Sequence, residues 1–246
     1  MSTKIDLFKS DYVQYNERKA TDEETKKQLR ENGIISRNIK TTKKKIISNS
    51  FEAAKHILNE CTDNGMESHI ENELENNDAL KEIRKKQPTR TPKALSDYQK
   101  EYTQHYKKNE EVINAIEKNG IKLSDGQTSF HGGGFIFNNK KDINILQEPL
   151  STSLSPEVAL RNAEHKGKAF KENEINLSVI EIKNNNVNAF VFKHKGTLHG
   201  NEKEILINAG AKIKVIKRVK LDKKYIVSNG VEKKEVNAYV NVVEVS

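Results

Sequence analysis

The segments Leu150-Ser-Thr-Ser-Leu-Ser-Pro-Glu157 and Gly200-Asn-Glu-Lys-Glu-Ile-Leu-Ile207 decide the fold. In the first, Ser155-Pro156 predicts the start of a helix, because proline is favoured at the first helical position. In the second, Glu204–Ile207 predicts a buried strand that Asn208-Ala-Gly210 ends. The first segment therefore places three hydroxyl residues directly before a helix, and the second places two carboxylates at the leading edge of a strand.

Further strand signals surround these two segments. From residue 121 on, β-branched residues and turn residues dominate, with one helix from Pro156 to about Lys166. A short strand, Gln127–Phe130, runs into His131-Gly132. The other predicted strands are Leu177–Ile182, Ala189–Phe192, Lys212–Leu221, Tyr225–Val227 and Val236–Val245.

The N-terminal part has a different character. It is highly charged, and capping patterns at Thr21-x-x-Glu24 and Asn49-x-x-Glu52 predict short amphipathic helices. The proline-containing segment Gln87–Lys93 interrupts helical structure and is the candidate linker. We therefore expect a helical region over residues 1–93 and a second domain over residues 94–246.

A tyrosine stripe opens that second domain. Ser96-x-x-Gln99 predicts a helix start, and Tyr98, Tyr102 and Tyr106 repeat on one helical face. Such a stripe could form a nucleotide platform, but packing of the helix onto a sheet is the favoured interpretation.

Composition limits the class of protein. The chain has 246 residues, a formal net charge of +8 and a single cysteine, Cys61, so intrachain disulfides are excluded. No apolar run approaches the roughly 18–20 residues that span a bilayer, and no secretory signal begins the sequence. The basic balance makes nucleic acid a partner to consider, although mixed lysine and glutamate favour an ordinary solvated surface.

Three short motifs follow one another along the chain: His131-Gly132, Ser151-Thr152-Ser153 and Glu202-Lys203-Glu204. Each is common alone, as a turn histidine, a helix cap or a charged strand edge. On a strand, Glu202 and Glu204 would point to the same face, and two carboxylates so close raise each other's proton affinity. His165, His194 and His199 fit no common metal site.

In this order and with these flanks, the motifs resemble those of the mono-ADP-ribosyltransferase family of bacterial toxins and phage enzymes. The resemblance covers roughly Ser96 to Ser246. It implies an α+β fold, with a core of two packed β-sheets and flanking helices behind a helical N-terminal region. It also implies NAD as substrate, no metal, and transfer of ADP-ribose to a host protein. The paired Glu-x-Glu is similar to the pattern of members that modify arginine.

The resemblance also implies roles for individual residues. Glu204 would be the main catalytic carboxylate, Glu202 would act on the acceptor, and Ser151 would hold Glu204. Segment 192–201 would recognise the acceptor, and segment 164–173 would lie near the NAD phosphates. The residues implied to bind NAD are His131, Gly132, Thr152, Ser153 and, as a lid over nicotinamide, Phe170.

One position departs from the pattern. Family members with Ser-Thr-Ser normally carry arginine where this chain has His131. An imidazole can bond a ribose hydroxyl but lacks the fixed charge and fork of guanidinium. Lys166, Lys168 and Lys171 are then the candidates to bind the NAD phosphates.

Several alternatives stay open. The chain could be an inactive transferase fold that binds NAD or a partner protein, or a basic scaffold that binds an acidic partner through its N-terminal helices. An active enzyme would also hydrolyse NAD when no acceptor is present. We expect action in cytoplasm, by a phage protein in its host or by an effector that is secreted or injected without a cleaved signal.

Overall fold

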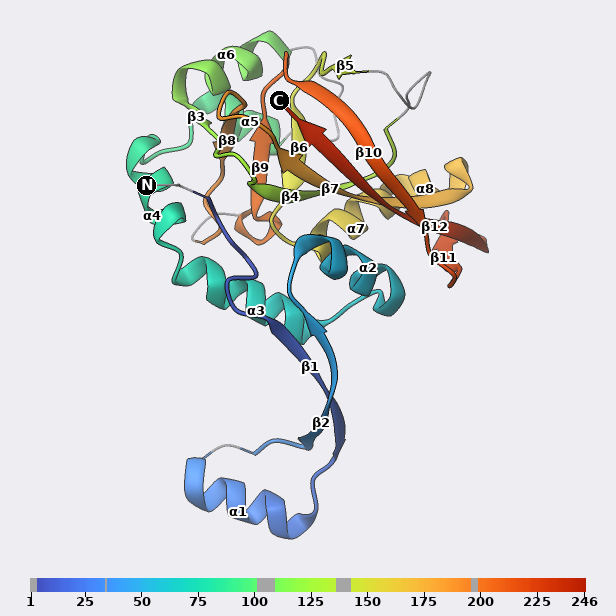
Figure 1. The fold of residues 1–246 in the computed structure, drawn as a ribbon. Helices are drawn as coiled ribbons and strands as arrows, with labels where there is room; N and C mark the ends of the chain where they lie inside the picture. Colours follow the sequence, from blue (N-terminus) through green and yellow to red (C-terminus); the bar gives the residue numbers. More distant parts are fainter. Residues whose placement is uncertain (1–3, 34, 101–108, 136–142, 196–198) are drawn as a thin grey trace.

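A computed structural model describes residues 4–33, 35–100, 109–135, 143–195 and 199–246 (Figure 1). The strands from residue 121 onward form a ten-stranded sheet in the order β3-β8-β9-β6-β4-β7-β12-β10-β5, with β11 paired to β12. Strands β7 and β12 are parallel, and the other described pairs are antiparallel. The bounds are β3 (Ile121–Lys122), β4 (Thr128–Gly132), β5 (Asn144–Ile145), β6 (Leu150–Ser153), β7 (Glu174–Ile182), β8 (Asn188–Val191), β9 (Glu204–Ile207), β10 (Lys212–Lys220), β11 (Tyr225–Ser228) and β12 (Lys233–Val245).

The sheet has two halves that meet at β4 and β6. In the described residues only Phe130 and Ser153 are matched across this junction, whereas β4 and β7 match over five positions. Figure 1 shows β8 and β9 running in a clearly different direction from β7 and β12. The α+β class is confirmed, and the two expected sheets are halves of one hydrogen-bonded network.

Helices cover both halves. Helix α7 (Pro156–Glu164) packs on β4 and β7, and α8 (Lys168–Glu172) follows it after a short 3-10 turn, η1 (His165–Gly167). The predicted start of α7 is confirmed, with Ser155 Oγ accepting a bond from the Val158 amide. Its end comes earlier than expected, because the backbone leaves the helical conformation at His165, which has ψ 132°. Helices α5 (Lys93–Lys100) and α6 (Asn109–Asn119) cover β8 and β9.

The N-terminal part contains the expected helices and two strands that the sequence analysis did not predict. The helices are α1 (Asp22–Asn32), α2 (Ser50–Glu60), α3 (Asn64–Glu75) and α4 (Asp78–Lys86), with the predicted caps at Thr21 and Asn49. The strands β1 (Tyr12–Lys19) and β2 (Asn38–Ile47) form an antiparallel ribbon. The expectation of a helical region is therefore wrong over these residues, because the charged run Lys43–Lys45 in β2 carries no apolar–polar alternation that would mark a strand.

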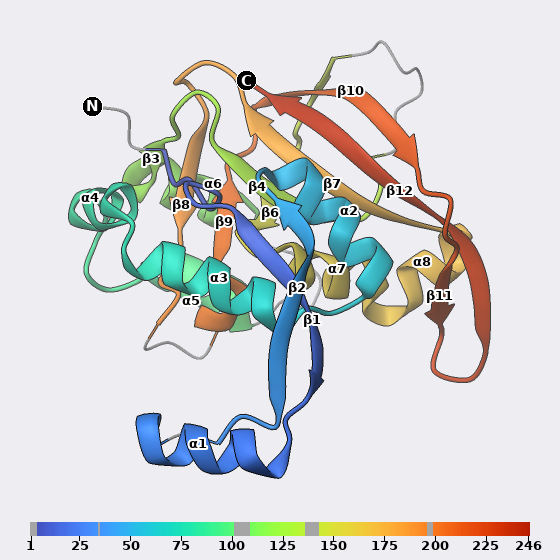
Figure 2. The same ribbon diagram turned by 60° about the horizontal axis from the view of Figure 1, so that its bottom comes forward.

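We call residues 12–47, which comprise β1, α1 and β2, the arm. Figures 1 and 2 both show it projecting from the rest of the molecule with α1 at its tip. Helix α1 buries none of its side chains. The arm carries ten lysines and arginines against five acidic residues, and so holds much of the net positive charge.

Helices α2, α3 and α4 share one hydrophobic core with the sheet that follows residue 93. Buried residues of α2 and α3, such as Ile57 and Ile70, belong to the same cluster as Leu177 of β7 and Val243 of β12. The expected linker also contacts the sheet, since the Gln87 amide, in its better orientation, pairs with the backbone of Val191. In the part of the chain that the structure describes, no helix is long and apolar enough to span a membrane.

Candidate active site

Glu204 is the first residue of β9 and is almost completely buried. Its Oε1 accepts a hydrogen bond from Ser151 Oγ at 2.7 Å and one from the Tyr98 hydroxyl at 3.2 Å. Its Oε2 accepts from Gln99 Nε2 at 3.1 Å. The register of β6 with β9 sets this geometry, because Ser151 lies opposite Leu206 and Ser153 lies opposite Glu204. Two of the three sequence motifs therefore meet directly.

Burial raises the pKa of Glu204 to about 7, well above its ordinary value. The hydrogen bonds from Ser151, Gln99 and Tyr98 stabilise the ionised form and oppose this rise, whereas the negative charge of Glu202 adds to it. A carboxylic acid whose pKa lies near neutral pH can change protonation state under physiological conditions, which is common at catalytic sites.

We expect Glu204→Gln to change how stability depends on pH. The pKa of Glu204 is about 7 in the folded protein, whereas its ordinary value of 4.5 applies to the unfolded chain. Folding therefore favours the protonated acid. The resulting stability is fully present below the unfolded pKa and is lost as pH rises through the folded pKa. Between about pH 4.5 and about pH 8, the free energy of unfolding of the wild type should fall by on the order of 2–3 kcal/mol relative to that of the variant. Urea unfolding of both proteins across that range measures this difference, and a difference independent of pH would contradict it.

Glu202 does not lie on the strand. The expectation that Glu202 and Glu204 point to the same face of one strand is therefore wrong. Glu202 ends a short 3-10 helix, η2 (Gly200–Glu202), and Lys203 has a left-handed backbone with φ 48° before β9 begins. The Glu202 backbone carbonyl accepts a 2.6 Å bond from Ser153 Oγ. Its side chain is half-exposed, with Oε1 3.3 Å from His199 Nδ1. The turn thus places an accessible carboxylate beside a buried one.

His131 completes the cluster from β4. Its Nδ1 lies 2.8 Å from the carbonyl oxygen of Ser151. A carbonyl only accepts, so Nδ1 carries the proton in this contact. Burial lowers the pKa of His131, as does the positive charge of Lys168, while the bond to Ser151 opposes the change. The neutral imidazole therefore presents Nε2 as a hydrogen-bond acceptor, and all three motifs converge on Ser151.

The other residues expected to bind NAD have structural contacts. Thr152 Oγ1 donates to the Ile205 carbonyl at 2.8 Å, which ties β6 to β9. Ser153 Oγ holds the Glu202 carbonyl and accepts from the Ser155 amide at 2.9 Å. Gly132 lies directly under α7, where a Cβ atom would be 1.8 Å from the Ala159 carbonyl oxygen. A role for these residues toward NAD stays a prediction.

Phe170 belongs to α8, which packs against β7 and β11, whereas Glu204 lies on β9. The Phe170 ring packs on the hydrophobic core, and Lys234 Nζ lies 4.3 Å from its centroid. This position does not favour the predicted lid, which stays untested. The segment expected to be a loop, residues 164–173, is mostly η1 and α8. Within the expected acceptor segment 192–201, residues 196–198 lie outside the described residues.

Sequence reasoning missed two partners of Glu204, Tyr98 and Gln99. Tyr98 packs as expected, with its ring 6.4 Å from that of Phe192, but its hydroxyl also reaches Glu204. The prediction that Ser96-x-x-Gln99 starts a helix is wrong. Helix α5 begins earlier, and the Ser96 amide donates to the Pro92 carbonyl inside it. Tyr102 and Tyr106 lie outside the described residues.

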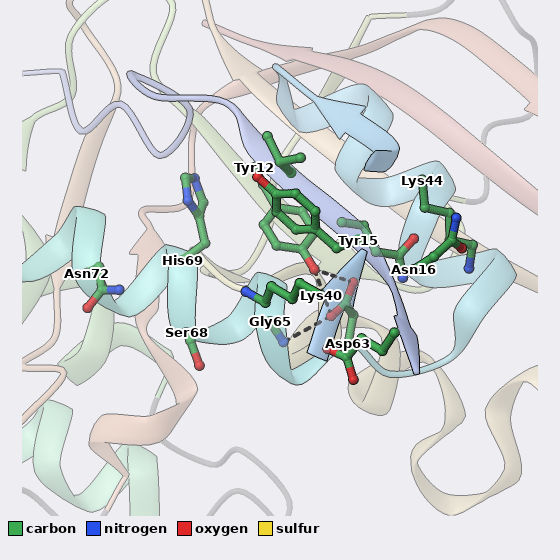
Figure 3. Close-up of a pocket in the computed structure, with 13 residues that line it drawn as sticks. Tyr12, Tyr15, Asn16, Lys40, Lys44, Asp63, Gly65, Ser68, His69 and Asn72 are labelled. Carbon is green, nitrogen blue, oxygen red and sulfur yellow. Dashed lines mark hydrogen bonds between the residues drawn. The ribbon is translucent and has the colours of Figure 1, made fainter. Parts of the chain in front are cut away.

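A separate cleft of 730 Å³ lies between the arm and α3 (Figure 3). Residues of β1, β2 and α3 line it, and none of the three motifs contributes. At its wall the Tyr12 hydroxyl donates to Asp63 Oδ2 at 2.8 Å. Asp63 also bonds His56 and caps α3 through the Gly65 amide. Among the described residues, no group of three or more histidine, cysteine or acidic side chains is arranged to hold a metal ion.

Comparison with known proteins gives structural matches only. No protein-family model matches the sequence, and no curated protein matches it. The ADP-ribosyltransferase Vis from Vibrio splendidus, solved with agmatine, is 16% identical, with a TM-score of 0.36, over 67% of this chain and 66% of Vis. Plx2a, an ADP-ribosyltransferase toxin from Paenibacillus larvae, is 17% identical, with a TM-score of 0.35, over 67% of this chain and 86% of its own.

Exoenzyme S from Pseudomonas aeruginosa, solved with human 14-3-3 protein beta and Carba-NAD, is 16% identical, with a TM-score of 0.36, over 62% of this chain and 68% of its own. Vis and Plx2a carry the name of the family that the motifs resemble. At these identities and TM-scores the likeness decides neither activity nor substrate. The functional proposal therefore rests on the geometry around Ser151.

Proposed function

We propose that the protein is an NAD-dependent mono-ADP-ribosyltransferase that modifies arginine in a host protein. One observation carries the proposal: the Ser151 hydroxyl donates to Glu204 while the Ser151 carbonyl accepts from His131, and Glu202 lies beside Glu204. Residues 94–246 hold every motif residue, and we assign the catalytic domain to them.

Glu204 would act on the nicotinamide ribose. When the bond between nicotinamide and ribose breaks, positive charge develops at the sugar carbon. A nearby ionised carboxylate stabilises that charge and accepts a bond from the ribose 2′-hydroxyl. With a pKa of about 7, Glu204 is partly ionised at neutral pH, and the cationic transition state favours the ionised form.

Glu202 would act on the acceptor. Its carboxylate is half-exposed, so it can accept the paired N–H groups of an arginine side chain from outside. It can also take a proton from the guanidinium as the nitrogen attacks the sugar carbon. The bond between ribose and nicotinamide breaks, the bond between ribose and the guanidinium nitrogen forms, and nicotinamide leaves. Water in the same position would give NAD glycohydrolase activity.

His131 would accept a bond from an NAD ribose hydroxyl through Nε2. Phosphate neutralisation would then require lysine, and the charge of Lys168 already acts on the His131 ring. Of Lys166, Lys168 and Lys171, we therefore favour Lys168. The proposal includes action in the cytoplasm of a host cell as a toxin or effector, with secretion and injection as alternative routes.

The proposal is tested with purified protein and adenine-labelled NAD. Agmatine serves as a small guanidinium acceptor, lysates of bacterial and eukaryotic cells serve as protein acceptors, and free nicotinamide is counted. We expect nicotinamide release together with label on agmatine and on discrete protein bands. Release without any acceptor labelling would leave a glycohydrolase. No release, with NAD binding retained, would instead support an inactive binding module.

A further inference from the structure

Lys203 stands between the two carboxylates of the motif yet is itself buried, with 4% of its side chain exposed. Its ammonium group bonds Glu67 Oε1 and lies 3.4 Å from Glu71 Oε1. Both partners come from α3, in the N-terminal region. A buried ammonium without a counter-ion is strongly unfavourable, so Lys203 depends on these carboxylates from a distant part of the chain.

Glu67 also holds a second element of the site. Its Oε2 accepts a 2.7 Å bond from Ser155 Oγ, and Ser155 is fully buried at the point where β6 passes into α7. The same hydroxyl caps α7 through the Val158 amide. One carboxylate thus connects the turn that carries Glu202 and Glu204 with the strand end that carries Ser151.

Helix α3 is fixed in place, so Glu67 is not a mobile surface group. Asp63 caps the helix and bonds both Tyr12 of the arm and His56 of α2. Met66, Ile70 and Leu74 of α3 are buried in the main core. The helix therefore presents Glu67 to Lys203 from a rigid position.

We infer that Glu67 is a positioning residue for the catalytic turn, which it sets by holding the buried ammonium of Lys203 away from Glu202 and Glu204. The inference rests on the proposed function. Peptide geometry supports it, because the left-handed backbone of Lys203 turns its side chain toward α3 and lets the chain enter β9 at Glu204. The N-terminal region is then part of the catalytic unit and does more than cover it.

The test is Glu67→Gln in the full chain. The amide oxygen keeps the bond from Ser155, but the negative charge that faces Lys203 is lost. Of the two α3 carboxylates, Glu71 alone then still faces the ammonium, at 3.4 Å. The less firmly held ammonium should turn toward the Glu202–Glu204 pair, so kcat for nicotinamide release should fall at least about tenfold while KM for NAD changes less than about twofold. Glu73→Gln is the matched control, because it removes the same charge from the same helix at a residue that bonds Ser10. We expect it to match the wild type.

Rescue separates this role from simple loss of stability. In the double variant Glu67→Gln/Lys203→Met the cation is gone, and we expect kcat to recover most of the loss. Unchanged kcat in Glu67→Gln, or no recovery in the double variant, would overturn the inference. Thermal unfolding of each variant confirms that it is folded.

A readout independent of turnover covers the case in which the wild type does not cleave NAD. The carboxyl carbon of Glu204 can be followed by NMR as pH changes, with Glu204→Gln to assign the signal. The groups facing this carboxyl are Ser151, Tyr98, Gln99 and Glu202. We expect the titration midpoint to fall in Glu67→Gln, because the ammonium of Lys203 approaches, and to return in the double variant. An unchanged midpoint refutes the positioning role, whereas an inactive wild type alone refutes only the proposed function.

Discussion

Glu204→Gln is expected to reduce NAD cleavage by a factor on the order of 10²–10³, because the neutral amide cannot stabilise positive charge on the ribose. The substitution conserves shape. Gln99 can rotate its amide to accept from the new NH₂ group, and Ser151 can still donate to the remaining oxygen. Nicotinamide release at saturating NAD measures the effect.

Two comparisons make this prediction sharp. Glu235→Gln removes an exposed carboxylate from β12 and should keep wild-type activity. Glu202→Gln should retain hydrolysis of NAD but lose labelling of agmatine, since the role proposed for Glu202 is toward the acceptor. The Glu204→Gln protein should also be the more stable one above about pH 7, so loss of activity could not be attributed to unfolding. Full activity in this variant would remove Glu204 from the mechanism.

Gly132→Ala is expected to destabilise the protein by roughly 3 kcal/mol or more. The added Cβ would lie 1.8 Å from the Ala159 carbonyl oxygen and 2.6 Å from the Ala163 amide nitrogen. Both are backbone atoms of α7, so the helix would have to move away from β4. Urea unfolding monitored by circular dichroism measures the loss.

Gly134→Ala is the matched control for this prediction. Its Cβ would meet only the Asn176 side-chain amide, at 3.2 Å, and a side chain can adjust. We expect a change below about 1 kcal/mol there. If Gly132→Ala were equally mild, the close packing of α7 on β4 would be incorrect.

The elements that the sequence predicts well are those with local signals. Strand β7 is rich in isoleucine, leucine and valine, Pro156 marks the start of α7, and Thr21 with Glu24 forms a complete capping box. The β1–β2 ribbon has no such signal, because its lysines resemble those of a solvated helix. Helix α5 was misplaced because Ser96 satisfies a capping pattern inside a helix that has already begun.

The contacts of the candidate site also fall into those that local sequence signals predict and those that they do not. The link between Ser151 and Glu204 could be expected, because the motifs of adjacent strands carry it. Tyr98, Gln99 and Glu67 could not be, since they lie more than a hundred residues from their partners and only tertiary packing brings them together. The relation of Glu202 to Glu204 was misjudged for a different reason. Period-two alternation assumes a continuous strand, and the left-handed Lys203 interrupts it.

The divergence of β4 from β6 after a single matched pair explains why the cluster forms where it does. Beyond Phe130 and Ser153, the backbone groups of these two strands no longer pair with each other. The Ser151 carbonyl is thereby released from the ladder on that side, and an imidazole occupies the place of a main-chain donor. Where neighbouring strands stop pairing, backbone carbonyls are left without a main-chain donor and can accept from a side chain instead. The contact between His131 and Ser151 therefore owes its position to the point at which pairing between β4 and β6 ends.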